Sequence, residues 1–172
     1  ILVAILYKKF RNHNCKIVVT FHGSDIYYYS PFSYFYRFCT KFIDAAIFVS
    51  PKLQNRMQLG ISQQVLSAGI LDVFQPPSLP VKKKYDFIFV GNLDANKGAD
   101  RLITLFEKLK TPCTVCIVGV GEYEDKFRSI DTIHQLDILG AQTPMVLKGL
   151  YQQSKYLVNL SKNESFGLVM TE

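Results

Sequence analysis

Strand-length runs of apolar residues alternate with segments of helical periodicity along most of the chain. The apolar runs predict strands at residues 15–22, 45–50, 64–67, 85–90, 114–118, 138–140 and 156–161. Apolar residues at helical spacing, bounded by proline or glycine, predict helices at residues 33–44, 51–60, 98–110 and 122–129, after Thr143 and after Gly167. This alternation predicts an α/β protein with doubly wound parallel sheets.

Residues 72–84 interrupt the alternation. The segment contains Pro76, Pro77 and Pro80 and ends in a run of lysines. Such a stretch, without periodicity and rich in proline, is typical of a linker between domains. We therefore expect the end of one α/β domain at residues 1–71 and the start of a second at residues 85–172.

The chain opens on an apolar run, residues 1–7, and not on methionine. The run is shorter than the ~20 apolar residues that span a bilayer. It also lacks the basic segment and the cleavage site of a signal peptide. We expect a core helix here, and an internal segment of a longer protein.

The composition is that of an ordinary globular protein, with 48% hydrophobic and 20% charged residues among 172. Among its cysteines, Cys113 and Cys116 have the spacing of a zinc or redox motif. They lie in an apolar strand segment, however, where positions three apart point to opposite faces. We expect buried free cysteines in a cytoplasmic protein, and no metal site.

The positive charge is concentrated in the first half of the chain. Residues 1–84 carry 11 Lys and Arg against 3 Asp and Glu, whereas residues 85–172 carry 9 against 11. The aromatic cluster at residues 27–38 lies in the basic half. Two interpretations stay open: a solvated basic face over an aromatic core, or peripheral contact with an anionic surface such as the inner face of a membrane. A nucleic-acid partner is not expected.

Two carboxylates, Glu164 and Glu172, stand eight positions apart at the end of the chain. They bracket a loop and a helix N-terminus that follow the predicted strand 156–161. A helix N-terminus offers unpaired N–H groups and partial positive charge, which suit a diphosphate. At ~1.5 Å per residue the two carboxylates are about 12 Å apart along the axis. The spacing suits a ligand with hydroxyl groups on both sides of a diphosphate, as in a nucleotide sugar.

The Glu164-x7-Glu172 pattern resembles the motif of retaining glycosyltransferases of family 4, the group 1 glycosyltransferases with the GT-B fold. Three further landmarks stand in the family's order: His22-Gly-Ser-Asp25, Phe89 to Gly98, and Ile117 to Gly121. The resemblance covers nearly all of the chain. It implies two Rossmann-like doubly wound domains facing across a cleft, both incomplete in this segment.

The resemblance also implies roles for individual residues. Lys97 would offset the diphosphate charge, His22 would lie near the transferred sugar, and Glu164 would bind the sugar hydroxyls. These three residues are the candidate catalytic residues, and Glu172 would bind the ribose. The donor-binding set that the resemblance implies is Gly91, Asn92, Lys97, Gly119, Gly121, Glu164, Phe166, Gly167, Leu168 and Glu172.

Each of these roles has a structural alternative. Lys97 could be an exposed loop lysine without a ligand, and His22 a structural histidine whose hydrogen bonds are made within the fold. Gly119-x-Gly121 is also a common pattern in tight turns. The sequence also departs from the family at two places. Asn92 replaces the usual arginine and brings no charge. The segment 67–74 lacks the family's Pro-Asn and shifts Asp72 by one, so no role is carried over to Asp72.

The leading hypothesis is a retaining hexosyltransferase that uses a nucleoside-diphosphate sugar and a glycan or lipid-linked acceptor. The family implies a reaction that needs no metal and no further cofactor. The alternative is a non-catalytic remnant or a nucleotide-sugar-binding module. A membrane- or polyanion-associated partner is a third hypothesis, compatible with the first. The motifs do not encode the base, the sugar, the acceptor or the linkage.

Overall fold

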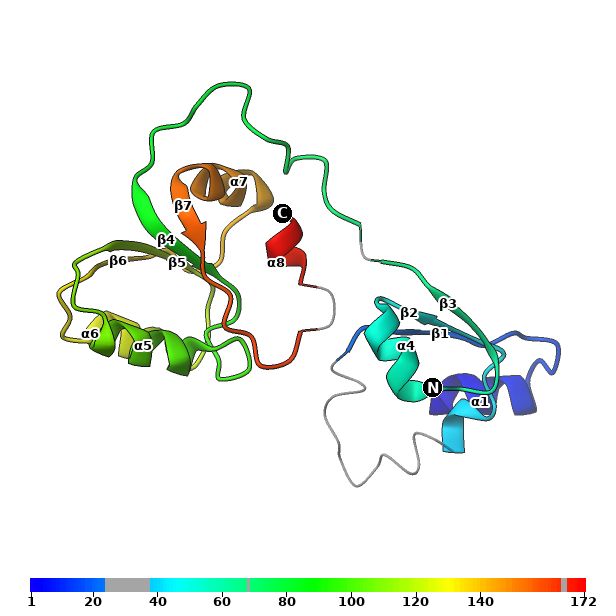
Figure 1. Ribbon diagram of the computed structural model, residues 1–172. Coiled ribbons are helices and arrows are strands. Elements are labelled where there is room, and N and C mark those ends of the chain that lie inside the picture. The colour runs from blue at the N-terminus through cyan, green and yellow to red at the C-terminus, as the bar shows by residue number, and fades with distance from the viewer. Residues whose placement is uncertain (24–37, 68, 165–166) are drawn as a thin grey trace. The chain divides into compact units, whose positions relative to one another are not determined.

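The computed structural model describes residues 1–23, 38–67, 69–164 and 167–172, which form two compact α/β units (Figure 1). The first unit comprises Ile1–Gly69 together with Glu164. The second comprises Ile70–Asn163 and Gly167–Glu172. The division between Gly69 and Ile70 lies shortly before the predicted linker, whose bounds stay a prediction.

The first unit contains a parallel sheet with the strand order β1-β2-β3. The strands are β1 (Val18–Phe21), β2 (Ala45–Phe48) and β3 (Ser62–Val65). The stacked rings of Phe21 and Phe48, with centroids 5.1 Å apart, form the centre of its core. All three strands overlap their predicted ranges, but β1 and β2 are shorter than residues 15–22 and 45–50. The third, β3, begins and ends two residues before the predicted 64–67, because it starts with polar residues that the apolar pattern does not mark.

Two helices of the first unit follow directly from the sequence. The opening apolar run forms α1 (Leu2–Phe10), but the prediction of a core helix is wrong for this structure: α1 has no buried residue, and only its partly buried Ile5 packs on the core. Pro51 opens α4 (Pro51–Met57) because its missing N–H is not needed at the first helical position. Within the described residues, no helix is long and apolar enough to cross a membrane.

The second unit contains a parallel sheet with the strand order β6-β5-β4-β7. Its strands are β4 (Tyr85–Val90), β5 (Thr114–Val118), β6 (Gln135–Ile138) and β7 (Ser154–Leu157). Its helices are α5 (Ala99–Lys108), α6 (Glu124–Ser129), α7 (Pro144–Gln152) and α8 (Leu168–Thr171). Strand and helix alternate as predicted, and each neighbouring pair of strands is parallel.

Helices cover both faces of this sheet. On one face, Phe89 and Ile117 pack against Leu102 of α5 and Phe127 of α6. On the other face, Ile88, Cys116 and Val118 pack against Leu150 of α7. Because alternate residues of β4 and β5 are buried on opposite faces, the sequences of these strands are nearly continuous apolar runs. The doubly wound arrangement predicted from the sequence is confirmed.

Cys113 and Cys116 lie on opposite faces of the sheet, as predicted. Cys113 packs beside α5 and α6, whereas Cys116 is buried beside α7. The Sγ atom of Cys113 is 3.3 Å from Nδ1 of the buried His134. Burial raises the pKa of both thiols, that of Cys116 to about 11. Both therefore stay protonated at neutral pH, which does not favour a thiolate site.

Two predicted strands of the second unit have different bounds in the structure. The strand predicted at 138–140 is β6, which begins at Gln135 and ends at Ile138, because Leu136 and Ile138 both pack into the core. The strand predicted at 156–161 is β7, which ends at Leu157. Beyond β7, Nε of Arg101 donates to the Leu160 carbonyl at 3.1 Å.

Asp86 joins three strands near their amino ends. Its Oδ2 accepts hydrogen bonds from the backbone N–H of Thr114 at 2.8 Å and from the Thr114 hydroxyl at 3.0 Å. Its Oδ1 accepts from Nζ of Lys155 at 2.8 Å. The bonds from Lys155 and then from Thr114 lower the pKa of Asp86 to about 2. The carboxylate thus connects β4 to both of its neighbours.

We predict that Asp86 makes the second unit sensitive to acid. A carboxyl group with a lowered folded-state pKa stabilises the fold fully above its unfolded pKa and loses that contribution as the pH falls toward the folded pKa. Between about pH 5 and pH 2, the free energy of unfolding of Asp86→Asn should therefore fall less than that of the wild type. Urea titrations at several pH values measure this, and the exposed Asp72→Asn is the control. Identical pH slopes for Asp86→Asn and the wild type would contradict the prediction.

Candidate functional site

The loops that follow β4 and β5 lie side by side at the carboxyl ends of these strands. The N–H of Gly91 donates to the Val118 carbonyl at 3.0 Å, and the N–H of Leu93 donates to the Val120 carbonyl at 2.9 Å. In return, the N–H of Tyr123 donates to the Leu93 carbonyl at 3.1 Å. Ligands of doubly wound sheets bind at this edge, so the two loops form a candidate site.

Glycine is required where the two loops meet. Gly119 has φ +139°, and a Cβ at this position would overlap the carbonyl oxygen of Gly91. A side chain at Gly119 would therefore separate the loops. The predicted glycines Gly91, Gly119 and Gly121 thus have a geometric reason to be glycine, independent of any ligand.

Lys97 lies against Gly91 within the β4–α5 loop. Its side-chain carbons are 3.6 to 3.8 Å from the position that a Cβ of Gly91 would occupy. The loop is held by Asp94, whose Oδ1 accepts from the backbone N–H of Lys97 at 2.7 Å. Lys97 is half-buried, and Asn92 is exposed. The structure therefore brings Lys97 together with Gly91 and, through it, with Gly119.

The loop after β7 packs against the same β4–α5 loop. The N–H of Lys162 donates to the Asn96 carbonyl at 2.7 Å, and Nη2 of Arg101 donates to the Leu160 carbonyl at 2.8 Å. A Cβ on Gly98 would be 2.5 Å from the Leu160 carbonyl oxygen. Three loops of the second unit thus converge at the carboxyl edge of its sheet. Asp94 and Arg101 hold them, although neither was among the predicted site residues.

Glu172 lies at the end of the short helix α8, whose N-cap is Gly167. Its Oε2 accepts a hydrogen bond from the hydroxyl of Tyr151 at 2.9 Å. Burial, and then the carboxylate, raise the pKa of Tyr151 well above its usual value. Gly167 is buried and Leu168 is exposed. These residues belong to the second unit, together with Gly91, Lys97 and Gly119.

The remaining predicted residues fall elsewhere. His22 directly follows β1 and is exposed, and Glu164 is half-buried; both are grouped with the first unit. Phe166 and Asp25 lie outside the described residues. The roles of all predicted site residues, and a site that joins residues of both units, stay predictions.

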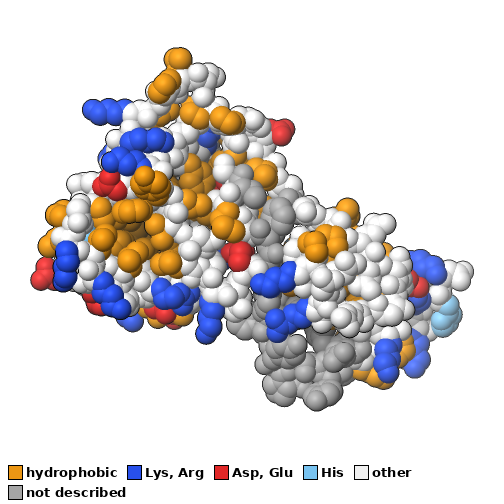
Figure 2. Space-filling view, viewed as in Figure 1, with side chains coloured by type: hydrophobic (Ala, Val, Ile, Leu, Met, Phe, Trp, Pro, Cys, Tyr) orange, Lys and Arg blue, Asp and Glu red, His pale blue; other side chains and the backbone are white. Residues whose placement is uncertain are grey.

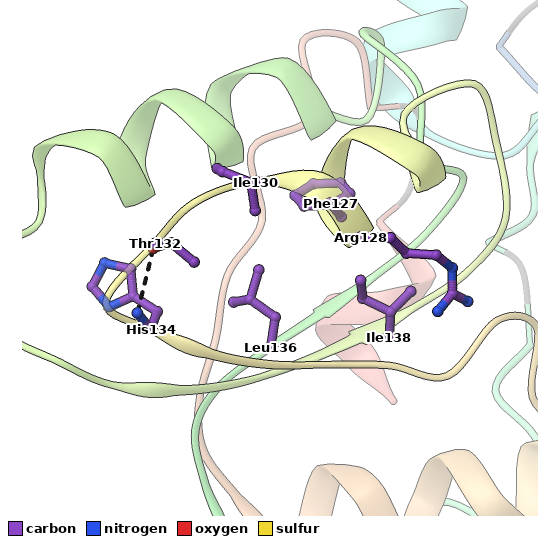
Figure 3. Close-up of a pocket in the computed structure, with 7 residues that line it drawn as sticks. All are labelled: Phe127, Arg128, Ile130, Thr132, His134, Leu136 and Ile138. Atoms are coloured by element: carbon purple, nitrogen blue, oxygen red, sulfur yellow. Dashed lines mark hydrogen bonds between the residues drawn. The ribbon is translucent and has the colours of Figure 1, made fainter.

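A cavity of about 360 Å³ in the second unit lies away from these loops (Figure 3). It is lined by Phe127 and Arg128 of α6, and by residues from Ile130 to Ile138 around β6. The N–H of His134 donates to the Thr132 hydroxyl at 3.3 Å across one end. This cavity contains none of the predicted site residues.

Figure 2 shows a group of hydrophobic side chains bordered by Lys and Arg on the surface of the second unit.

The first unit has a basic cavity of about 430 Å³. Lys8, Lys9, His13 and Lys41 line it, together with Asp44. Asp44 accepts from Nζ of Lys8 at 2.6 Å and from the N–H of Ile17 at 2.8 Å, which lower its pKa to about 2. Part of the predicted positive charge is thus neutralised within the unit, and contact with an anionic membrane stays a prediction.

A family model and one relative identify a glycosyltransferase. A family model described as glycosyl transferases group 1 matches residues 72–172. The uncharacterized glycosyltransferase MJ1178 of Methanocaldococcus jannaschii is 24% identical over 162 residues, which is 90% of this chain and 45% of that protein. The chain therefore spans less than half the length of this relative.

Solved structures show the same fold. TarM matches with a TM-score of 0.68 at 15% identity, over 93% of this chain and 34% of its own. The pneumococcal O-GlcNAc transferase GtfA, solved in complex with UDP and GlcNAc, matches with a TM-score of 0.67 at 20% identity, over 98% of this chain and 37% of its own. The predicted GT-B-like α/β fold is confirmed, and the chain spans about a third of these structures.

We predict that Gly119→Ala destabilises the protein by about 3 kcal/mol or more, because strain at positive φ adds to overlap with the Gly91 carbonyl. Gly149→Ala is the matched control: a Cβ in this turn of α7 would contact only the Gln153 side chain, at 3.9 Å, among the described atoms. The control should be neutral or stabilising by up to about 1 kcal/mol, because alanine is the better helix former. Urea unfolding measures both, and equal effects would argue against a tight loop contact.

Proposed function

We propose that this chain, which belongs to the group 1 glycosyltransferases, supplies the donor site of an enzyme that transfers a hexose from a nucleoside-diphosphate sugar. The acceptor would be a glycan or a lipid-linked sugar, and the anomeric configuration would be retained. The observation that supports this most directly is the convergence of three loops at the carboxyl edge of the second sheet. These loops carry Gly91, Lys97 and Gly119.

The chemistry of these loops suits a diphosphate. Glycine, which has no side chain, lets a phosphate approach the backbone closely, and a lysine ammonium is a compact positive charge. When the bond between C1 of the sugar and the diphosphate oxygen breaks, negative charge develops on the departing diphosphate. Lys97, held half-buried against Gly91, would stabilise that charge. The pneumococcal relative solved with UDP and GlcNAc supports a nucleotide-sugar donor by analogy.

The other predicted residues would complete the donor site. Glu164 would accept hydrogen bonds from hydroxyl groups of the transferred sugar, and His22 would lie near that sugar. Asn92 would donate to the diphosphate, and Gly167 and Leu168 would present N–H groups to it at the start of α8, as would Phe166. Glu172 would accept from the ribose hydroxyls. We propose that these groups act without a metal or other cofactor, because the resemblance implies that cation and N–H donors stabilise the leaving group.

A nucleotide-sugar-binding module without transfer activity is the second candidate. Asn92 favours it, because the family usually has arginine at this position and asparagine carries no charge. Both candidates bind the same donor and differ in turnover. Sugar transfer by the complete protein therefore decides between them.

We predict that Lys97→Ala or Glu164→Ala in the complete protein lowers the turnover number by at least ~100-fold, the usual effect of removing one group that stabilises a transition state. Lys110→Ala and Glu122→Ala are matched controls, because both residues are exposed and outside the predicted site. Transfer of radiolabelled sugar from a panel of nucleotide sugars gives the rates. Near-wild-type rates for Lys97→Ala and Glu164→Ala would exclude these roles, and binding without transfer by the wild type would favour the module.

We predict that the product keeps the anomeric configuration of the donor. The new bond to the acceptor oxygen would form on the face of C1 from which the diphosphate leaves. Proton NMR of the purified product measures this through the coupling between H1 and H2 of the transferred sugar. An α-linked donor should give an α-linked product, and a β-linked product would show inversion.

A further inference from the structure

The hydrogen bond between Tyr151 and Glu172 joins two helices of the second unit. Tyr151 lies in the last turn of α7, and Glu172 follows α8, 21 residues later in the chain. The donor–acceptor distance of 2.9 Å is that of a good hydrogen bond. Burial and the carboxylate raise the pKa of Tyr151, so its hydroxyl keeps its proton and acts as the donor at neutral pH.

The ring of Tyr151 is held from two sides. It packs against the core cluster that contains Ile88 and Cys116 of the sheet and Leu150 of α7. Phe74, from the segment before β4, contacts it edge-on with the ring centroids 6.0 Å apart. Because the ring is fixed, its hydroxyl presents a donor at a defined place.

The chain before β4 is tied to the end of α7 at two places. Next to Phe74, Nε2 of Gln152 donates to the Gln75 carbonyl at 3.5 Å. Nζ of Lys83 donates to the carbonyl of Gln152 at 2.8 Å and to that of Ser154 at 2.9 Å. Phe74, Tyr151 and Glu172 also line one cavity of about 430 Å³. Packing thus extends from this segment through Tyr151 to the carboxylate.

We propose that Tyr151 is a positioning residue, whose hydroxyl orients the Glu172 carboxylate to accept hydrogen bonds from the ribose hydroxyls of a nucleoside diphosphate. This inference rests on the proposed function. A glutamate side chain loses rotamer freedom when it binds a ligand, and a preformed hydrogen bond reduces that loss on binding. A carboxylate has about four lone-pair positions, so the bond from Tyr151 leaves acceptors for a diol.

A purely structural role for this hydrogen bond makes a different prediction. It would change the stability of the fold and affect every ligand of the site alike. A positioning role affects only ligands whose ribose hydroxyls reach Glu172. Nucleotides with and without these hydroxyls therefore distinguish the two roles.

The experiment uses calorimetric titration of the complete protein with UDP, GDP and ADP, and then with the 2′,3′-dideoxy form of the tightest binder. Tyr151→Phe removes only the hydroxyl. It should raise the dissociation constant of the ribonucleotide by about 10-fold, the effect of losing a hydrogen bond to a charged group. The dissociation constant of the dideoxynucleotide should change by no more than about 2-fold. Tyr156→Phe is the matched control, because Tyr156 is 65% exposed on β7.

A double-mutant cycle sharpens the test. Glu172→Gln should also weaken binding of the ribonucleotide and not of the dideoxynucleotide. The double variant should bind the ribonucleotide no more weakly than Glu172→Gln does, because both changes act through one carboxylate. Phe74→Leu should also weaken binding of the ribonucleotide. It removes the ring that packs against Tyr151, and so acts on the Glu172 carboxylate while Tyr151 itself is unchanged. It is the second variant if Tyr151→Phe does not fold, as thermal unfolding will show.

The outcomes are separable. If the wild type binds none of the nucleoside diphosphates, the proposed function fails and this inference falls with it. If the wild type binds but Tyr151→Phe binds both nucleotide forms as the wild type does, or weakens both equally, only the positioning role is overturned. Selective loss of the ribonucleotide, absent in Tyr156→Phe, supports it.

Discussion

The contact between Gly119 and the Gly91 carbonyl is the constraint on which the carboxyl edge of the second sheet depends. It allows the loops after β4 and β5 to share backbone hydrogen bonds, beginning with that from Gly91 to Val118. Lys97 packs over Gly91, and Asp94 fixes the turn that carries it. The position of the Lys97 side chain thus depends on backbone contacts between its own loop and the neighbouring loop, which explains why a loop lysine is held half-buried.

The parts of the fold that are buried on both faces could be predicted closely from the sequence. The bounds of β4 and β5 agree with the predicted 85–90 and 114–118, because each is a continuous apolar run between two helix layers. The outer strand β6 alternates Gln135 and Asp137 with core residues, so an apolar run marks only its end. The segment after β7 is held by tertiary bonds, such as that from Arg101 to the Leu160 carbonyl, and no local pattern encodes them.

The candidate site divides in the same way. Gly91, Lys97 and Gly98 are close in sequence, and β4 carries them together to one edge, so a local motif was sufficient to find them. Asp94 accepts from the backbone N–H of Lys97, three residues later, a local side-chain bond typical of aspartate and a signal that sequence reasoning missed. The partners of Glu172 and Leu160 lie 21 and 59 residues away and depend on how α7 and α5 pack. Such pairs become visible only in the folded chain.

The electrostatics of the second unit favour recognition at short range. Residues 85–172 carry 9 basic and 11 acidic side chains, and several of the basic ones are neutralised locally, as Lys155 is by Asp86 and Arg128 by Glu124. A region with no excess of positive charge does not attract an anion over a long distance. If a diphosphate binds at these loops, as we propose, short-range contacts such as that with Lys97 would have to hold it. On this view the geometry of the loops, and not the overall charge, determines whether the anion binds.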